Sequence, residues 1–200
     1  MAINLQKGQR ISLTKEAGRG LARVVMGLGW GMKQVQSKGF LGFGAGTRQE
    51  SVDLDASCLL FDNSGNLADT VWFRQLKSHC GSIHHSGDDR SGGGEEGADN
   101  ERISIDLDQV PATVQTLIFT VNSFSGESFA GIPNAFCRLV DDATGNEVAR
   151  FDLSLEAGNH TGLVMTKLYR HDNEWKMQAI GESAEGRTFH DLLPALRPHL

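Results

Sequence analysis

At residues 51–61 the chain reads Ser51-Val52-Asp53-Leu54-Asp55-Ala56-Ser57-Cys58-Leu59-Leu60-Phe61. The first half of this stretch alternates polar and apolar residues, and the second half is continuously apolar. Alternation is typical of a strand with one buried face, whereas a short apolar run is typical of a strand buried on both faces. We therefore predict a strand that has one polar end and runs into the core of a β-sandwich.

Similar strand patterns recur along the rest of the chain. We predict further strands at residues 9–13, 21–30, 71–73, 102–107, 116–121, 136–140, 147–153, 162–169 and 175–180. Turn signals rich in Asp, Asn and Gly separate them at short intervals, as at residues 62–66 and 141–146. Strands do not alternate with helices, which favours an antiparallel arrangement over a parallel α/β fold. The prediction is an all-β, antiparallel two-sheet β-sandwich that forms a single domain over residues 1–200.

Two segments depart from the strand pattern. Residues 188–191 (Thr-Phe-His-Asp) resemble a capping box that opens a short C-terminal helix, with Pro194 and Pro198 limiting its length. Residues 31–50 are basic and rich in glycine, and we predict that they form a loop inserted between strands.

Composition and charge exclude several classes of protein. The 200 residues carry a net charge of −6, which argues against nucleic-acid binding because phosphate recognition needs a basic face. The first residues lack the basic-then-apolar pattern of a signal peptide, and no run approaches the ~18 apolar residues of a membrane span. We therefore expect a cytoplasmic protein without a membrane span, and the oligomeric state stays open.

Three cysteines occur without motif spacing, at Cys58, Cys80 and Cys137. An odd number of cysteines in a cytosolic protein indicates free thiols. Cys58 and Cys137 lie in apolar runs, so we predict that both are small core residues.

An acidic loop at residues 79–101 accounts for most of the chain's net negative charge. Within it, residues 87–101 contain six carboxylates, five glycines and one arginine, or about −5 of the total −6. Like charges this close repel one another. Such a loop is either solvated and disordered or a cage for a hard cation, of which calcium is the favoured occupant.

Asp53 and Asp55 provide a second source of ligands. Residues two apart on a strand point to the same face, so these two carboxylates lie together. If the acidic loop folds over that end of the strand, enough carboxylates converge for more than one ion. The alternatives are a solvated loop and an ordinary solvent-facing strand edge. Zinc binding by Cys80, His84 and His85 is less favoured because their spacing matches no familiar zinc motif.

Six stretches of the sequence together resemble a known family. They are Leu5-Gln6-Lys7-Gly8-x-x-Ile11-Ser12-Leu13, Gly27-Leu28-Gly29-Trp30, Asp53-Leu54-Asp55-Ala56-Ser57, Gly87-Asp88-Asp89-Arg90-Ser91-Gly92, Asn134-Ala135-Phe136-x-Arg138 and Leu168-Tyr169-Arg170-His171-x-x-x-Glu174-Trp175-Lys176. They span nearly the whole chain in order, and the chain resembles the TerD family of tellurium-resistance and stress proteins, closest to its TerZ-type members.

The resemblance implies a β-sandwich that binds two Ca²⁺ ions through a long acidic metal-binding loop. It also implies a non-enzymatic scaffold or sensor in a cytosolic bacterial system associated with resistance to tellurite, phage and colicins. The implied partners are other Ter-family proteins, among them a membrane-bound Ter protein at the inner membrane.

The metal ligands are carried over residue by residue. Asp53 and Asp55 match the family's Asp-Leu-Asp motif, and Asp88 matches the start of its acidic loop, while Asp89 and Ser91 stand where Asn and Thr are usual. A short insertion follows, which shifts the register of the remaining acids. The predicted metal ligands are Asp53, Asp55, Asp88, Asp89, Ser91, Glu95, Glu96, Asp99 and Glu101.

Two other functions compete with this interpretation. Clustered carboxylates also hold catalytic magnesium or calcium in hydrolases, so a metal-dependent hydrolase is one alternative. The other is binding of tellurite by a thiol, for which Cys80 is the best exposed candidate.

Overall fold

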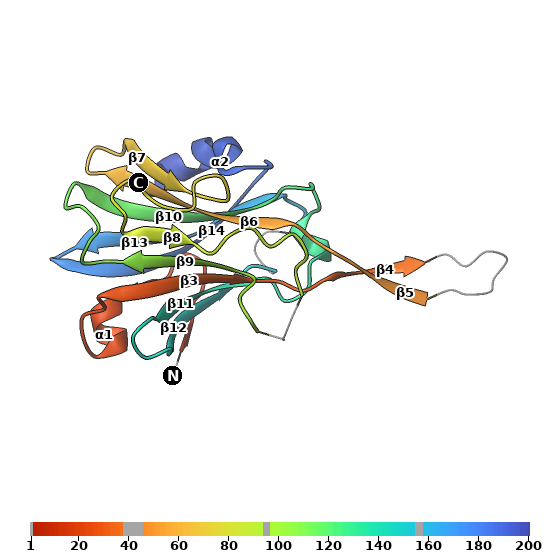
Figure 1. Cartoon of the computed structure of the whole chain (residues 1–200), viewed down its shortest axis with the longest axis horizontal. Coiled ribbons are helices and arrows are strands. Elements are labelled where there is room, and N and C mark those ends of the chain that lie inside the picture. Colours follow the sequence, from red (N-terminus) through yellow and green to blue (C-terminus); the bar gives the residue numbers. More distant parts are fainter. Residues whose placement is uncertain (1, 38–45, 94–96, 155–157) are drawn as a thin grey trace.

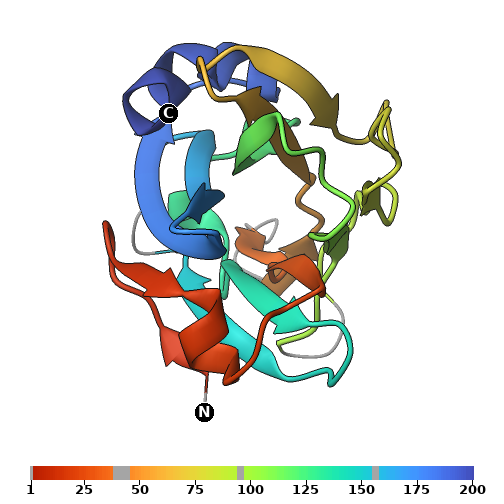
Figure 2. The same ribbon diagram turned by 90° about the vertical axis from the view of Figure 1, so that its left-hand side faces the viewer.

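Two six-stranded sheets face each other and enclose the core of the protein, as the views in Figures 1 and 2 show. The computed structural model describes residues 2–37, 46–93, 97–154 and 158–200. Helix is limited to short segments, so the predicted all-β, two-sheet sandwich is confirmed.

Sheet A has six strands in the order β1-β12-β11-β3-β9-β8. Its neighbouring strands are antiparallel, except for the parallel pair of β1 and β12. Its members are β1 (Ile3–Asn4), β12 (Glu147–Asp152), β11 (Phe136–Asp141), β3 (Arg23–Gly29), β9 (Glu101–Asp106) and β8 (Ile83–His85).

Sheet B is antiparallel throughout, in the order β2-β14-β13-β10-β6-β7. Its members are β2 (Arg10–Ser12), β14 (Glu174–Ala184), β13 (Gly162–His171), β10 (Val114–Ser123), β6 (Leu54–Asp62) and β7 (Leu67–Val71). The strand predicted at residues 71–73 thus begins earlier and ends at Val71, whereas β1 and β8 have no counterpart among the predicted strands.

Side-chain alternation in sheet B separates two apolar layers. On β10, Leu117, Phe119 and Val121 point into the core between the sheets, while Ile118 belongs to a second cluster on the outer face. Helix α2 (Phe189–Leu196) covers that outer face and completes the second cluster with Phe189, Leu192 and Leu196. Cys58 and Cys137 are fully buried free thiols in the core, as predicted.

Short helices close the ends of strands. The predicted C-terminal helix is α2, and the Asp191 carboxylate at its start accepts hydrogen bonds from the amides of Arg187 and Thr188 at 2.9 and 3.1 Å. Helix α1 (Leu13–Ala17) follows β2 directly, so the predicted strand 9–13 ends sooner than expected. The hydroxyl of Ser12 caps α1 by accepting a bond from the Lys15 amide. Two 3₁₀ turns, η1 (Phe129–Gly131) and η2 (Arg197–His199), complete the helical content of the described residues.

A two-stranded arm projects from one end of the sandwich (Figure 1). It consists of β4 (Lys33–Ser37) and β5 (Gly46–Glu50), which pair in an antiparallel register from Lys33 opposite Glu50 to Ser37 opposite Gly46. The prediction of a loop over residues 31–50 is therefore wrong for these ten residues, and residues 38–45 of that predicted loop lie outside the described part of the chain. The arm's strands lack a face that packs on the core, so their sequence shows no apolar alternation to reveal them.

Candidate metal centre

Three carboxylates meet at the end of the sandwich that carries the arm. Oxygen atoms of Asp53, Asp55 and Asp88 all lie within 4.8 Å of one another. Asp55 is on β6, Asp53 directly precedes that strand, and Asp88 belongs to the loop between β8 and β9. Asp55 is buried, Asp53 half-buried and Asp88 exposed, so the cluster runs from the interior to the surface. The structure thus brings together the two parts of the chain that the sequence pattern pairs.

An interruption in sheet B explains why these groups meet here. Strand β7 pairs with β6 only from Cys58 onward, so the backbone of Ala56 has no strand neighbour on that side. Buried backbone groups need partners, and side chains from sheet A supply them. The Glu101 Oε2 atom accepts a hydrogen bond of 2.7 Å from the Ala56 amide, and His85 Nε2 lies 3.2 Å from the Ala56 carbonyl oxygen.

Glu101 also holds the start of the acidic loop. Its side chain is fully buried, and its Oε1 atom accepts a hydrogen bond of 3.2 Å from the Asp89 amide. His85 Nδ1 accepts a bond from the Gly87 amide at 3.0 Å, so its Nε2 atom carries the proton and points 3.4 Å from Glu101 Oε2. Glu101 therefore lies behind the cluster and positions both β6 and the loop around it.

The electrostatics of the cluster are unfavourable without a cation. Burial, followed by the nearby charges of Glu101, Asp53 and Asp88, raises the pKa of Asp55 to about 7. Burial and the charge of Asp88 also raise the pKa of Asp53. Asp53 Oδ1 and Asp55 Oδ2 are buried and have no hydrogen-bond partner among the described residues. Such orphaned, mutually repelling oxygens are what a divalent cation would neutralise.

The donor set suits a hard cation. All three groups offer oxygen, and Ca²⁺ takes six to eight oxygens at roughly 2.3–2.6 Å in flexible geometry. Three carboxylates supply part of that shell, and the exposed side at Asp88 is open to water. Asp88 also accepts a hydrogen bond of 2.9 Å from exposed Arg90.

Asp89 and Ser91, two further predicted ligands, are engaged within the loop. Asp89 Oδ1 accepts bonds from the Ser91 amide at 2.9 Å and the Ser91 hydroxyl at 2.6 Å, while Oδ2 accepts from Asn100 Nδ2 at 3.2 Å. Partial burial opposes ionisation of Asp89, but these hydrogen bonds outweigh it and lower its pKa. Both residues therefore stabilise the turn at residues 89–91, beside the cluster.

Asp99 is placed away from the cluster. Its carboxylate forms a bidentate ion pair with Arg138, at 2.7 and 3.1 Å, on the outer face of sheet A. There it rests on Gly27, where an added Cβ would overlap the carboxylate. The structure therefore does not bring Asp99 to Asp53 and Asp55. The other two predicted ligands, Glu95 and Glu96, lie outside the described residues.

Sequence reasoning did not predict the structural roles of His85, Asn100 and Trp30: His85 was considered only as a less favoured zinc ligand, and Trp30 only as part of a family-like stretch. Asn100 accepts a bond of 2.9 Å from the Trp30 amide, and Trp30 Nε1 donates to the Val52 carbonyl at 2.9 Å. Trp30 thereby ties the acidic loop to the start of β6. The available signals were weak: His85 ends a strand of only three residues, and Trp30 directly follows β3, which ends at Gly29.

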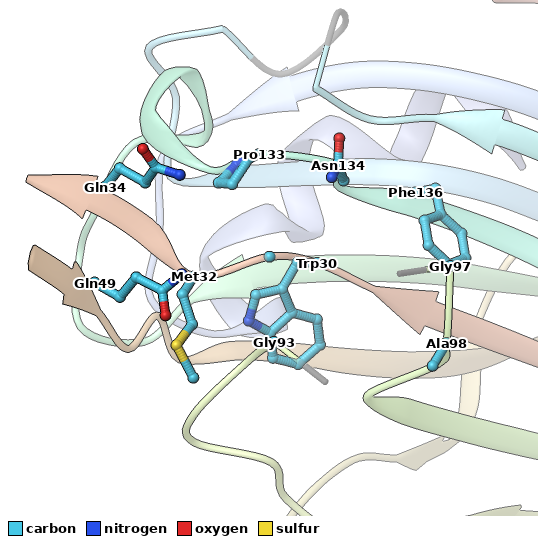
Figure 3. Close-up of a pocket in the computed structure, with 11 residues that line it drawn as sticks. Trp30, Met32, Gln34, Gln49, Gly93, Gly97, Ala98, Pro133, Asn134 and Phe136 are labelled. Carbon is cyan, nitrogen blue, oxygen red and sulfur yellow. The ribbon is translucent and has the colours of Figure 1, made fainter. Parts of the chain in front are cut away.

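A cavity of about 380 Å³ adjoins the acidic loop at the base of the arm. Figure 3 shows Trp30 and Gly93 on one side of it, with Pro133, Asn134 and Phe136 across from them. Gln34 and Gln49 of the arm complete its polar part, and its lining contains no charged side chain among the described residues. Gly93, Gly97 and Ala98 of the acidic loop line this cavity, and Trp30, which also lines it, is hydrogen-bonded to the loop through Asn100.

Comparison with known proteins agrees with this architecture. The sequence matches the family model of the TerD domain over residues 1–194. It is 46% identical to the tellurium resistance protein TerZ of Serratia marcescens, over 95% of this chain and 94% of that protein. It is 37% identical to the stress response protein SCP2 of Bacillus subtilis (strain 168), over 96% of this chain and 98% of that protein.

A solved structure shares the fold. A homologue of telluride resistance protein (TerD) from Streptomyces coelicolor A3(2) superposes with a TM-score of 0.65 at 18% identity, covering 86% of this chain and 96% of the other. In the described part of the chain, no helix has the length and apolar character needed to cross a bilayer. On the family match and these relatives, the chain belongs to the TerD domain family of tellurium-resistance and stress proteins.

Proposed function

We propose that this protein binds Ca²⁺ at Asp53, Asp55 and Asp88 and acts as a non-enzymatic, calcium-dependent scaffold or sensor in bacterial tellurite resistance and stress response. The buried, unpartnered oxygens of Asp53 and Asp55 support the ion site. The relatives named for tellurium resistance and stress response support the biological setting. A second ion, with ligands in the distal half of the acidic loop, stays a prediction.

The ion would act by joining two distant segments. Without a cation, three carboxylates within 4.8 Å repel one another and loosen the loop from β6. With the ion bound, the loop is fixed to the sandwich, and the native state is stabilised according to ligand concentration over Kd. A surface formed by the ordered loop is then available to a partner only when calcium is present.

Calcium is favoured over magnesium because of the site's shape. The carboxylates come from two segments with different exposure, an arrangement that suits the flexible coordination of Ca²⁺. Magnesium demands near-ideal octahedral geometry and retains several waters. The protein should therefore discriminate between the two ions.

Thermal unfolding tests this function. Chelator-treated protein should melt at a higher temperature after addition of calcium, with a smaller change after equal magnesium. The exposed-site variant Asp108→Asn should respond like wild type, because Asp108 lies outside the cluster. An unchanged midpoint in millimolar calcium would refute the ion site.

The partners and location follow from the same proposal. We propose that the chain works in the cytoplasm with other Ter-family proteins, including a membrane-bound Ter protein at the inner membrane. Co-purification of this chain with those proteins in calcium, and its loss in chelator, tests the scaffold role. Equal recovery of the partners in calcium and in chelator would show that partner binding does not depend on the ion.

One observation favours a second candidate function, thiol binding of tellurite. Cys80 is exposed, and its Sγ atom lies 3.3 Å from the Ser78 hydroxyl and 3.1 Å from the Ser82 hydroxyl. Partial burial opposes ionisation, but these hydrogen bonds outweigh it and lower the pKa of Cys80. A lowered pKa increases the reactive thiolate. Tellurite consumption by purified wild type, lost in Cys80→Ser, would support this candidate, and equal consumption would remove it.

A further inference from the structure

Asn122 lies directly opposite Asp55 in sheet B. The two residues are paired in the register between β10 and β6. Facing residues of an antiparallel pair point to the same side of the sheet, with Cβ atoms roughly 4.5–5.5 Å apart. Their side chains therefore share the outer face of sheet B, the face that α2 covers farther along these strands.

The amide of Asn122 has one satisfied end and one orphaned end. Its side chain is almost fully buried, at 1% exposure, and its Nδ2 atom donates to the Gly186 carbonyl at 3.1 Å. Its Oδ1 atom is buried and accepts no hydrogen bond from any described residue. Asp55 Oδ2 is likewise buried and has no hydrogen-bond partner among the described residues. Two facing acceptors without a donor between them are costly in an interior.

We propose that Asn122 Oδ1 is a further ligand of the cation held by Asp53, Asp55 and Asp88. Amide carbonyl oxygens are ordinary ligands of Ca²⁺, and the three carboxylates leave room in its shell. The hydrogen bond to Gly186 fixes the amide so that nitrogen faces one way and oxygen the other. The assignment rests on the proposed function, because it names a ligand of that same ion.

This ligand would connect the ion to α2. Gly186 precedes the helix, and its own amide donates to the Thr161 hydroxyl at 3.0 Å. A cation bound by Asn122 Oδ1 would fix the Asn122 side chain. Asn122 in turn binds Gly186, in the segment that leads into α2. Calcium binding at the end of β6 would then slow hydrogen exchange in residues 186–192.

The chain offers a matched control. Thr161→Val removes the other tie to Gly186 but leaves every proposed ligand in place. Asn122→Leu removes the oxygen and the bond to Gly186 but keeps a side chain that branches at Cγ into two terminal heavy atoms. Asn122→Asp keeps an oxygen for the ion and adds a charge, but it loses the donor to the Gly186 carbonyl.

Calorimetric calcium titration of these variants tests the assignment. Asn122→Leu should weaken calcium binding on the order of tenfold or more, Asn122→Asp should strengthen it, and Thr161→Val should leave it unchanged. Calcium should protect the amides of residues 186–192 in wild type but not in Asn122→Leu or Asn122→Asp, because neither replacement can donate to the Gly186 carbonyl.

The failures are distinguishable. Wild-type affinity in Asn122→Leu overturns the assignment alone, since a bridging water would then account for the orphaned oxygens. Equal weakening in Asn122→Leu and Thr161→Val also overturns it, because the effect would come from the loosened segment. Absence of calcium binding by the wild type overturns the proposed function and this assignment together. If Asn122→Leu does not fold, Asn122→Asp decides: affinity no higher than wild type refutes the ligand.

Discussion

Glu101 and Ala56 belong to different sheets, and a buried hydrogen bond of 2.7 Å joins the carboxylate of one to the amide of the other. The bond replaces a missing strand at the edge of β6, since β7 reaches only as far as Cys58. Glu101 also accepts from the Asp89 amide. One side chain therefore sets both the polar end of β6 and the start of the acidic loop.

Replacing Glu101 should destabilise the fold. Glu101→Ala leaves the Ala56 and Asp89 amides without their acceptor, and an unsatisfied buried donor such as the Ala56 amide costs about 1–3 kcal/mol. Urea unfolding measures the loss, with the exposed-site variant Glu182→Ala as control. Equal stability of the two variants would show that Glu101 is not a structural bridge.

Asp55→Asn should separate stability from ion binding. It removes a buried charge that repels Glu101, Asp53 and Asp88, so the calcium-free protein should melt at a higher temperature than wild type. The same change removes a ligand charge, so calcium should raise its midpoint far less. Melting curves in chelator and in calcium check both effects. A variant that is less stable in chelator and fully responsive to calcium would contradict the account.

The pH dependence of the calcium-free protein follows from Asp55. Its pKa in the folded protein is about 7, above the ordinary value of 3.8, so the native state binds more protons than the unfolded state between these values. Stability rises with pH only where the unfolded state binds more protons. The free energy of unfolding should therefore carry a component that falls as pH rises from about 4 to about 7. Asp55→Asn should lack this component in urea unfolding at matched pH, and an identical pH profile would contradict the raised pKa.

Asp99 and Asp88 should behave differently although both lie in the acidic run. Asp99→Asn weakens the ion pair with Arg138 and should lower stability while leaving calcium affinity unchanged. Asp88→Asn should lower calcium affinity, because Asp88 belongs to the cluster. Calcium titration of the two variants compares them directly. Loss of affinity in Asp99→Asn would restore Asp99 as a ligand.

Gly92 should be intolerant of a side chain. Its φ is +63°, and an added Cβ would overlap Trp30 Nε1, the atom that donates to Val52. Gly92→Ala should displace Trp30, shift its fluorescence and weaken calcium binding. Gly145→Ala is the control, since Gly145 has a φ of +71° with open space around it. Gly145→Ala introduces the strain of a side chain at positive φ without any overlap. Equal effects in both variants would show that the overlap with Trp30 is unimportant.

Local patterns in the sequence predict much of this architecture. The two-residue period of a strand places Asp53 and Asp55 on one face, and the apolar run after them identifies a buried strand. What escapes prediction depends on long-range partners. Asp99 and Glu101 occupy the same acidic run, but Arg138 draws one to sheet A and the Ala56 amide fixes the other behind the cluster. Neither partner is marked by spacing.

The most direct test of the central claim is a crystal structure grown in calcium, with anomalous differences used to locate the ion. The account predicts a peak between the carboxylates of Asp53, Asp55 and Asp88, with oxygen distances of about 2.3–2.6 Å. An ordered loop with no peak there, or a calcium ion bound only at other residues, would contradict it.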